Sequence, residues 1–329
     1  MSPRDPELTE FLDVLGRLVQ RDSDSERPPQ LLDEDPLEGR LREAGALDLA
    51  SETLDMDDAL RWLAEVVACA AHHDPSIGFS LAARYVAQRA LVRTAGAEAL
   101  ERAVTAALAE PTQGREVTVT VAHRFAPARV LVVATDAEET TWAPLGPAER
   151  AQSPRRTGLS GALLRDSTLT CGHPTTGHPA RAARTEWGLL VSAACVGTAE
   201  GALSAASAYA AERRQFGSRL VDFAGLRAVL GEMALRVTQA RALLDAALEA
   251  AMGEGGSDYQ APGDALVATS GRTAVAVALD AIQVHGGYGY IEEYPVAAML
   301  RDAISLRARS FARRDAVAAL AGSGAGVSS

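Results

Sequence analysis

Apolar residues recur every three or four positions over most of this chain, which is the period of amphipathic α-helices. In the first such stretch, 7–20, Leu8, Phe11 and Leu15 share one face. Asp74-Pro75-Ser76 interrupts the helical pattern and offers a helix break followed by a cap. The same spacing predicts further helices over 57–72, 76–109, 187–213, 219–251, 265–285 and 296–320.

The apolar period changes to two in the middle of the chain. The stretch EVTVTVAHRF (116–125) alternates strictly, and ARVLVVAT (128–135) is a short apolar run typical of a buried strand. Residues 136–185 are rich in Gly, Pro, Thr and Ser, which favours a small β segment with irregular connections. The predicted fold is therefore mainly α with a small β domain. We expect an N-terminal helical domain (1–110), a reduced β domain (111–185), a C-terminal helical bundle (186–321) and a disordered tail (322–329).

The composition is that of a globular protein that does not bind nucleic acid. Apolar residues make up 47% of the 329 residues and charged residues 23%. The net charge of −11 opposes binding to a polyanion, which needs a basic face. The sequence contains no lysine, and this excludes both Schiff-base chemistry and a Walker A phosphate loop.

The cysteine pattern and the N-terminus predict a cytoplasmic protein without membrane contact. The three cysteines, Cys69, Cys171 and Cys195, form no CxxC pair, as is typical of reduced thiols. The N-terminal MSPRDPELTEFLDVLG has no apolar signal core. We also expect no apolar run of the roughly 18 residues that a membrane span requires.

A cluster of possible metal ligands occurs in CGHPTTGH (171–178). It contains Cys171, His173 and His178, but no fourth ligand follows at a spacing typical of zinc sites. The sequence therefore predicts a polar loop here and no metal site.

Two short stretches in the C-terminal half carry residues suited to phosphate binding. ERRQFGS (212–218) ends an alanine-rich helical run, and guanidinium groups suit phosphate oxygens. Taken alone, it is equally compatible with a solvated helix end. QVHGGYGYIEEYPVAAMLRDA (283–303), taken alone, predicts a tight turn between two helices.

Together, these two motifs resemble the C-terminal domain of acyl-CoA dehydrogenases, which carry an RxxFG-type motif and a QxxGGxGY…EYP…RDA motif in this order. DPSIGFSLAARYVAQRAL (74–91) resembles their N-terminal helical domain, and TGLSGALLRDSTL (157–169) resembles the end of their middle β domain. The similarity covers nearly the whole chain and is strongest from about 186 to 303. It implies an acyl-CoA dehydrogenase-like fold and an oligomer, because the family shares its FAD between subunits.

The resemblance also implies FAD-binding residues. Arg213 matches the arginine that contacts the FAD pyrophosphate of a neighbouring subunit. Gln215 and Phe216 match residues on the adenosine side of the cofactor. The family turn along the pyrophosphate and adenine corresponds to Gln283, Gly286 and Gly287. Guanidinium and backbone N–H groups are suitable donors to phosphate, and glycine permits a close approach.

The catalytic glutamate of the family is missing from its usual position. Family members remove the α-proton of an acyl-CoA with this carboxylate while a hydride leaves to flavin, but the matching position here falls near Ser310. A serine without a base cannot take this proton because its own pKa is far too high. Some members carry the base near the start of the long helix instead, where Trp187 falls on the position and Glu186 lies beside it. Glu186 is therefore the candidate catalytic residue, although a glutamate there also favours a helix start.

The middle domain is also short and lacks the turn that holds the flavin ring. Three functional hypotheses account for this pattern. The chain is one subunit of a heteromeric FAD-dependent enzyme that desaturates an acyl thioester, with a second acyl-CoA dehydrogenase-like subunit supplying what is missing. A second hypothesis is a repurposed enzyme of secondary metabolism that performs a different reaction, with or without flavin. A third hypothesis is a non-catalytic structural subunit.

Overall fold

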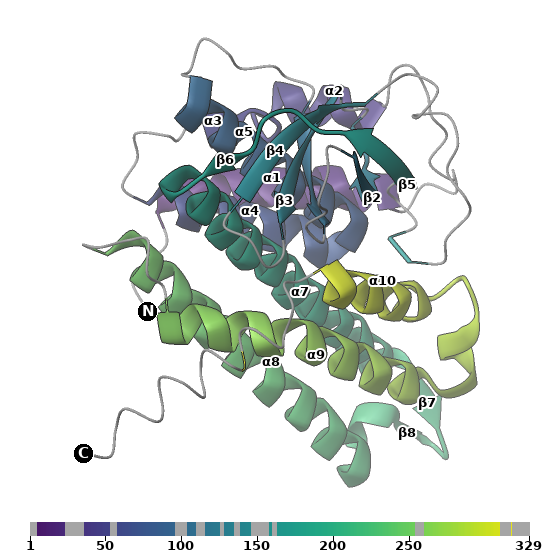
Figure 1. The fold of residues 1–329 in the computed structure, drawn as a ribbon. Coiled ribbons are helices and arrows are strands. Elements are labelled where there is room, and N and C mark those ends of the chain that lie inside the picture. The colour runs from purple at the N-terminus through teal and green to yellow at the C-terminus, as the bar shows by residue number, and fades with distance from the viewer. Residues whose placement is uncertain are drawn as a thin grey trace, which may run out of the picture.

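The computed structural model describes residues 5–23, 36–52, 58–95, 104–109, 116–125, 128–134, 139–145, 158–159, 163–253, 260–309 and 317. The helices are α1 (Pro6–Ser23), α2 (Pro36–Glu43), α3 (Leu49–Glu52), α4 (Ala59–His73), α5 (Pro75–Ala95), α7 (His178–Glu212), α8 (Ala224–Met252), α9 (Gln260–His285) and α10 (Val296–Arg309), with 3₁₀ turns η2 (Leu220–Asp222) and η3 (Gly286–Tyr290). The strands are β1 (Val104–Ala109), β2 (Glu116–His123), β3 (Arg129–Ala134), β4 (Glu139–Pro144), β5 (Leu163–Thr170), β6 (Thr175–Thr176), β7 (Arg214–Gln215) and β8 (Ser218–Arg219). The predicted mainly α fold with a small β part is confirmed (Figure 1). The predicted disordered tail, 322–329, lies outside the described residues.

Two small sheets pack face to face in the middle of the chain. One has the strand order β1-β3-β4-β6, with β1 and β3 parallel, and the other is the antiparallel pair β2-β5. Val117, Val119 and Val121 of β2 are buried against the first sheet, as their alternation predicts. On β3, Val130 and Val132 face this apolar layer, whereas Leu131 and Val133 face the helical core. The first sheet is thus covered by helices on one face and by the second sheet on the other.

The helix predicted over 76–109 is wrong beyond Ala95. Asp74 caps its start as predicted, because its Oδ1 accepts hydrogen bonds from Ser76 N at 2.7 Å and Ile77 N at 3.3 Å. After α5, however, residues 104–109 form β1, which lies N-terminal to the domain boundary predicted at 110. The alanine-rich VTAALA sequence has no strong period, and the pairing of β1 with β3 decides its conformation.

α7 is the longest element and begins nine residues before the predicted 187. Pro179 lies in its first turn, where a missing N–H costs nothing. Its first half packs into the core formed with α4 and α5, and its second half packs into the bundle core with α8, α9 and α10. The helix therefore joins the N-terminal helices to the C-terminal bundle (Figure 1).

Two glycines let α4 approach α7 closely. A Cβ at Gly197 would overlap the backbone oxygen of Ala68, and a Cβ at Gly201 would overlap that of His72. Only a glycine fits at such a contact between helix backbones. The alanine and glycine content of α7 thus serves tight helix packing.

Two segments have the length and hydropathy of a membrane span, contrary to the sequence expectation. They are α7 and the stretch Pro262–Tyr290. In α7, 78% of the apolar window is buried inside the protein, which is typical of a core helix.

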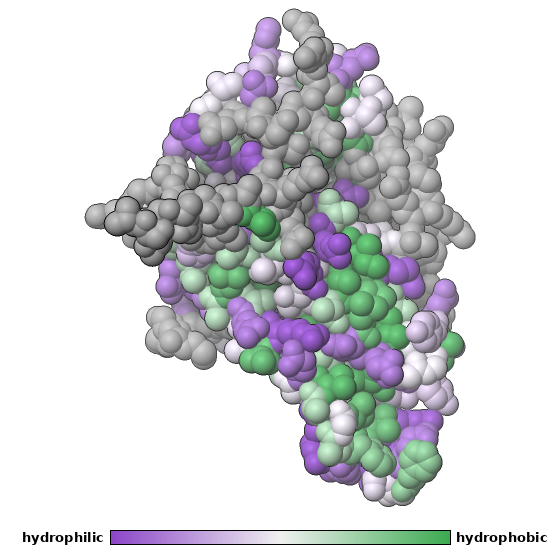
Figure 2. Space-filling view, turned by 60° about the horizontal axis from the view of Figure 1, so that its bottom comes forward, coloured by the Kyte–Doolittle hydropathy of each residue, from purple (hydrophilic) through white to green (hydrophobic). Residues whose placement is uncertain are grey.

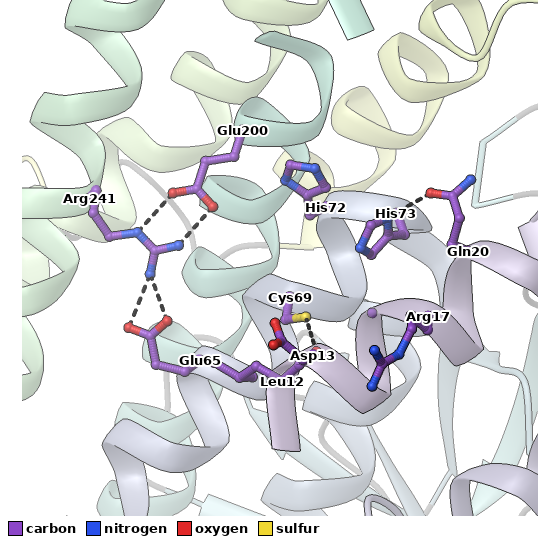
Figure 3. A pocket seen from close by; sticks show the side chains of 11 residues that line it. Leu12, Asp13, Arg17, Gln20, Glu65, Cys69, His72, His73, Glu200 and Arg241 are labelled. Carbon is purple, nitrogen blue, oxygen red and sulfur yellow. Dashed lines mark hydrogen bonds and ion pairs between the residues drawn. The ribbon is translucent and has the colours of Figure 1, made fainter. Parts of the chain in front are cut away.

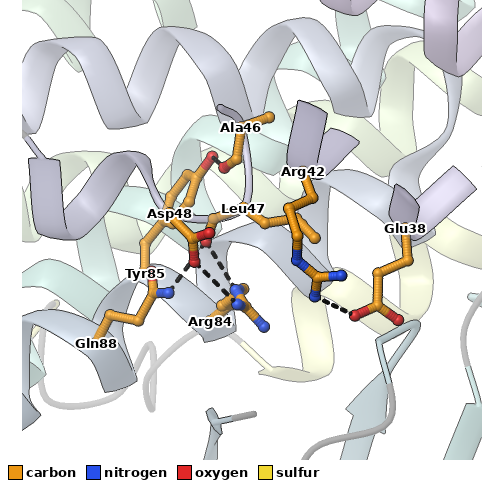
Figure 4. Close-up of polar contacts among 8 residues, drawn as sticks. All are labelled: Glu38, Arg42, Ala46, Leu47, Asp48, Arg84, Tyr85 and Gln88. Carbon is orange, nitrogen blue, oxygen red and sulfur yellow. Dashed lines mark hydrogen bonds and ion pairs between the residues drawn. The ribbon is translucent and has the colours of Figure 1, made fainter. Parts of the chain in front are cut away.

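A polar network fixes the turn after α2 to α5 (Figure 4). The buried Arg84 donates from Nε to Leu47 O at 2.8 Å and from Nη2 to Asp48 Oδ1 at 3.3 Å. Tyr85 donates its hydroxyl hydrogen to Ala46 O at 2.5 Å. These bonds satisfy the carbonyls of a segment without regular structure and anchor the N-terminal helices.

Candidate functional site

The first predicted motif forms the C-terminal end of α7 and a tight hairpin. Arg213 N donates to Tyr209 O at 2.9 Å and ends the helix, while Arg213 O accepts from Leu220 N at 2.8 Å. β7 and β8 then pair around Phe216 and Gly217, both at positive φ (52° and 83°). Phe216 is 94% exposed at the tip of the hairpin, where an aromatic ring is available to a ligand or a partner.

The second predicted motif forms the turn beside this hairpin. Gln283 is exposed near the C-terminal end of α9, and Gly286 and Gly287 begin η3. Gly286 has φ +59°, a conformation that favours glycine. A Cβ added at either glycine would have no atom of the described residues within 4 Å. The surface above both glycines is therefore open.

Arg213 joins the two motifs. Its guanidinium carbon lies 4.8 Å from the ring centroid of Tyr288 in η3. Two residues from motifs far apart in the sequence thus meet on one surface at the end of the bundle. The roles assigned to Arg213, Gln215, Phe216, Gln283, Gly286 and Gly287 stay predictions.

An aromatic cluster lies beneath Arg213, and none of its members is among the predicted FAD-binding residues: Tyr209, His285, Tyr288 and Tyr294. Tyr209 stacks on His285 with centroids 4.2 Å apart, and Tyr294 contacts both rings edge-on. Burial lowers the pKa of His285, and its Nδ1 lies 2.8 Å from Ala281 O. The imidazole is consequently neutral near pH 7 and Nδ1 carries its hydrogen. The signal in the sequence was the density of Tyr and His residues within the second motif.

The candidate base, Glu186, is not free to take a proton. It is 4% exposed, and its Oε1 accepts from Arg89 Nε and Arg93 Nη1, both at 2.7 Å, while Oε2 accepts from Arg93 Nη2 at 2.8 Å. Burial alone would raise the pKa of this carboxyl, but the charges of Arg93 and Arg89 outweigh it and lower the pKa. A carboxylate held by two arginines is a weak base, and the geometry gives Glu186 a structural role in joining α7 to α5. The sequence signal for this double ion pair was the spacing of Arg89 and Arg93, which lie one helical turn apart and so share a helix face.

Trp187 is buried at the position where some family members carry the base. It is 1% exposed, its Nε1 donates to Arg309 O at 2.9 Å, and its ring meets Phe79 edge-on at 5.8 Å. The guanidinium of Arg309 lies over Phe79 at 5.3 Å. Ser310, which aligns with the usual base position, lies outside the described residues.

A cavity of about 600 Å³ lies away from these motifs, between α1, α4, α7 and α8 (Figure 3). On one side Arg241 of α8 binds Glu200 of α7 at 2.7 and 2.9 Å and Glu65 of α4 at 3.3 Å. His72 lies beside them, and burial, followed by the charge of Arg241, lowers the pKa of its imidazole. None of the sequence-predicted site residues that the structure describes lines this cavity.

The predicted polar loop at 171–178 connects β5, β6 and the start of α7. Cys171 is half-buried, and burial raises the pKa of its thiol. Within the part of the chain that the structure describes, no three His, Cys, Asp or Glu side chains are grouped to hold a metal ion.

Comparison with known proteins identifies relatives of the C-terminal half and of the fold. Residues 187–309 match the family model "Acyl-CoA dehydrogenase, C-terminal domain". The short-chain specific acyl-CoA dehydrogenase of Clostridium acetobutylicum is 37% identical over 113 residues, 34% of this chain and 29% of that protein. The caffeyl-CoA reductase-Etf complex subunit CarC of Acetobacterium woodii is 35% identical over 114 residues, 35% of this chain and 30% of that protein. The matched segment thus spans less than a third of either relative.

The whole chain shares the fold of solved acyl-CoA dehydrogenases. The butyryl-CoA dehydrogenase of Megasphaera elsdenii superposes with a TM-score of 0.75 and 18% identity, covering 97% of this chain and 98% of that chain. This likeness establishes the architecture of the chain.

Proposed function

We propose that this chain, whose residues 187–309 match the acyl-CoA dehydrogenase C-terminal domain, is one subunit of an FAD-dependent enzyme that desaturates an acyl thioester. A second chain of the same fold completes the flavin site and supplies the proton-abstracting base. The observation that carries this proposal is the position of Arg213, which is held at the bundle end beside the open η3 turn.

The residues at the bundle end fit the diphosphate and adenosine of FAD. Among the residues that the structure describes, no acceptor contacts the Arg213 guanidinium, whose N–H groups suit phosphate oxygens. The open backbone at Gly286 and Gly287 permits close approach of an anion, and Phe216 offers an exposed ring. FAD, when bound, supplies a hydride acceptor, and this chain's residues would hold its far end.

We assign the base to a partner because the side chains at both described candidate positions, Glu186 and Trp187, are engaged in other contacts. Glu186 is held by Arg89 and Arg93, and Trp187 is buried against Phe79. Neither side chain can approach an α-proton without breaking these contacts. The relative CarC carries a name that places it in a complex, which agrees with a multi-subunit arrangement.

The bundle also offers a surface for a second subunit. Figure 2 shows apolar side chains gathered in a stripe between polar ones on the bundle. Leu235 of α8, Leu279 of α9 and Ile304 of α10 are each about half exposed. Exposed apolar stripes of this kind are typical of protein–protein contacts.

The test is the visible absorption spectrum of the chain purified alone and after co-expression with acyl-CoA dehydrogenase-like chains encoded beside it. A colourless chain that becomes yellow with a partner, and then desaturates an acyl-CoA, would establish the proposal. A yellow, active chain alone would show a self-sufficient enzyme. Absence of flavin in both preparations would favour the structural or repurposed alternatives.

Arg213→Ala tests the half-site within that experiment. Removing the guanidinium should lower the flavin content of the assembled complex several-fold, because a charge-assisted hydrogen bond to phosphate is lost. Arg227→Ala is the matched control, since Arg227 donates to Asp222 O on the surface of the same bundle. Equal flavin content in all three proteins would refute the half-site.

A further inference from the structure

Hydrogen bonds fix the backbone of Arg213 on both sides, so only its side-chain torsions can change where the guanidinium lies. The contact that holds the guanidinium in place is the ring of Tyr288. The N–H and the C=O of Arg213 both form backbone hydrogen bonds, to Tyr209 and Leu220. Its guanidinium lies over the Tyr288 ring at 4.8 Å. A guanidinium directs its N–H donors within its own plane, so a partner on its face leaves the donors available for a ligand.

Tyr288 is in turn held by the aromatic cluster. Its ring meets Tyr294 at 5.9 Å with a tilt of 69°. Tyr294 is packed against Tyr209 of α7 at 5.5 Å and His285 of α9 at 5.4 Å. Tyr288 is 42% exposed, and one edge of its ring rests on Tyr294, which is itself held between α7 and α9.

We propose that Tyr288 is a positioning residue: its ring sets the plane of the Arg213 guanidinium so that the guanidinium meets a diphosphate with two parallel N–H donors. This inference rests on the proposed flavin half-site and adds a residue that acts only through Arg213. An arginine without this support would lose side-chain entropy on binding and would bind the diphosphate more weakly.

Tyr288→Phe and Tyr288→Leu separate the proposed role from a merely structural one. Phe retains the ring face and loses only the hydroxyl, whereas Leu keeps apolar bulk without a π-face. Tyr290→Leu is the matched control, because Tyr290 lies two residues away in the same turn, is 77% exposed, and has no ring contact with the cluster among the described residues.

The first readout needs no ligand. The rate at which phenylglyoxal labels Arg213 in the full-length chain is measured by mass spectrometry. We expect Tyr288→Leu to raise this rate about two- to five-fold, the size of a partly exposed cation–π interaction. Tyr288→Phe and Tyr290→Leu should label like the unmodified chain. Equal labelling of the Phe and Leu variants would overturn the inference.

The second readout is FAD binding by the same variants co-expressed with the partner chain, followed by flavin fluorescence and by protection of Arg213 from labelling. Tyr288→Leu should weaken FAD binding by the same two- to five-fold, whereas Tyr288→Phe should bind FAD as the unmodified chain does. Weaker binding by Arg213→Ala together with unchanged binding by Tyr288→Leu would overturn the inference and keep the half-site. The expected labelling pattern without any protection by FAD would leave Tyr288 as the support of Arg213 and overturn the half-site.

Discussion

The indole nitrogen of Trp187 donates a hydrogen bond to the backbone oxygen of Arg309 at 2.9 Å, and this bond ties the first half of α7 to the C-terminal end of α10. The two residues are separated by 122 positions in the chain. The two candidate positions for a catalytic base that the resemblance implied, near Glu186 and near Ser310, fall next to these two residues in the sequence. In this protein they are joined by a structural contact instead.

Trp187→Phe should destabilise the protein by about 1 kcal/mol more than Trp62→Phe does. The first change removes a hydrogen bond inside the core, whereas the Trp62 Nε1 is buried without a partner among the described residues, so its loss leaves no acceptor unpaired there. Both variants lose a similar volume. Urea unfolding measures the two free energies of unfolding, and equal losses would contradict a stabilising bond to Arg309.

Glu186→Gln should destabilise the protein by about 3 kcal/mol, because it leaves the part-buried guanidinium groups of Arg89 and Arg93 without their counter-charge. Glu232→Gln is the surface control, since Glu232 pairs with Arg236 one turn away in an exposed position. Its cost should stay within about 0.5 kcal/mol. Thermal unfolding of both variants tests the difference.

The contribution of Glu186 should also depend on pH. Because its folded pKa is lowered, the stabilisation is present above the unfolded value of about 4.3 and is lost as the pH falls through the folded pKa. The free energy of unfolding of the unmodified chain should therefore fall more steeply below pH 4 than that of Glu186→Gln. Parallel curves would argue against the ion pair.

His72 should reduce stability in a different pH range. Its folded pKa is lowered by burial and by Arg241, so the unfolded chain binds more protons as the pH falls below about 6.5. We expect unfolding curves to show a loss of stability between pH 7 and pH 5 that is smaller in His72→Asn. The pKa of His285 is also lowered by burial, so His285→Asn should reduce the loss of stability in the same pH range.

Gly197→Ala should cost about 1–3 kcal/mol, because the added methyl group would overlap the backbone of α4 at Ala68. Gly231→Ala on α8 makes the same chemical change where no atom of the described part of the chain lies within 4 Å of the new Cβ. This control should be stabilised by up to about 1 kcal/mol through helix propensity. Chemical denaturation should show a lower free energy of unfolding for Gly197→Ala and a higher one for Gly231→Ala. A lower value for both variants would show that helix packing is not the cause.

The sequence by itself determined the helical character, the alternating face of β2 and the two motifs at the bundle end. These features depend on local periodicity or on residues close in the chain: Val117, Val119 and Val121 must share a face of a strand. The tight turns at Gly217 and Gly286 likewise follow from local backbone preference. Features of this kind can be predicted from the sequence without knowledge of the tertiary packing.

Only the tertiary structure decided the end of α5, the partners of Glu186 and the support of Arg213. VTAALA is compatible with either period until β3 pairs with β1. Glu186 becomes a weak base because Arg93, 93 residues away, lies against it in a buried site. These outcomes depend on how segments far apart in the chain pack against each other. That packing decides which charges meet and which groups are buried, and it produces no periodic pattern in the sequence.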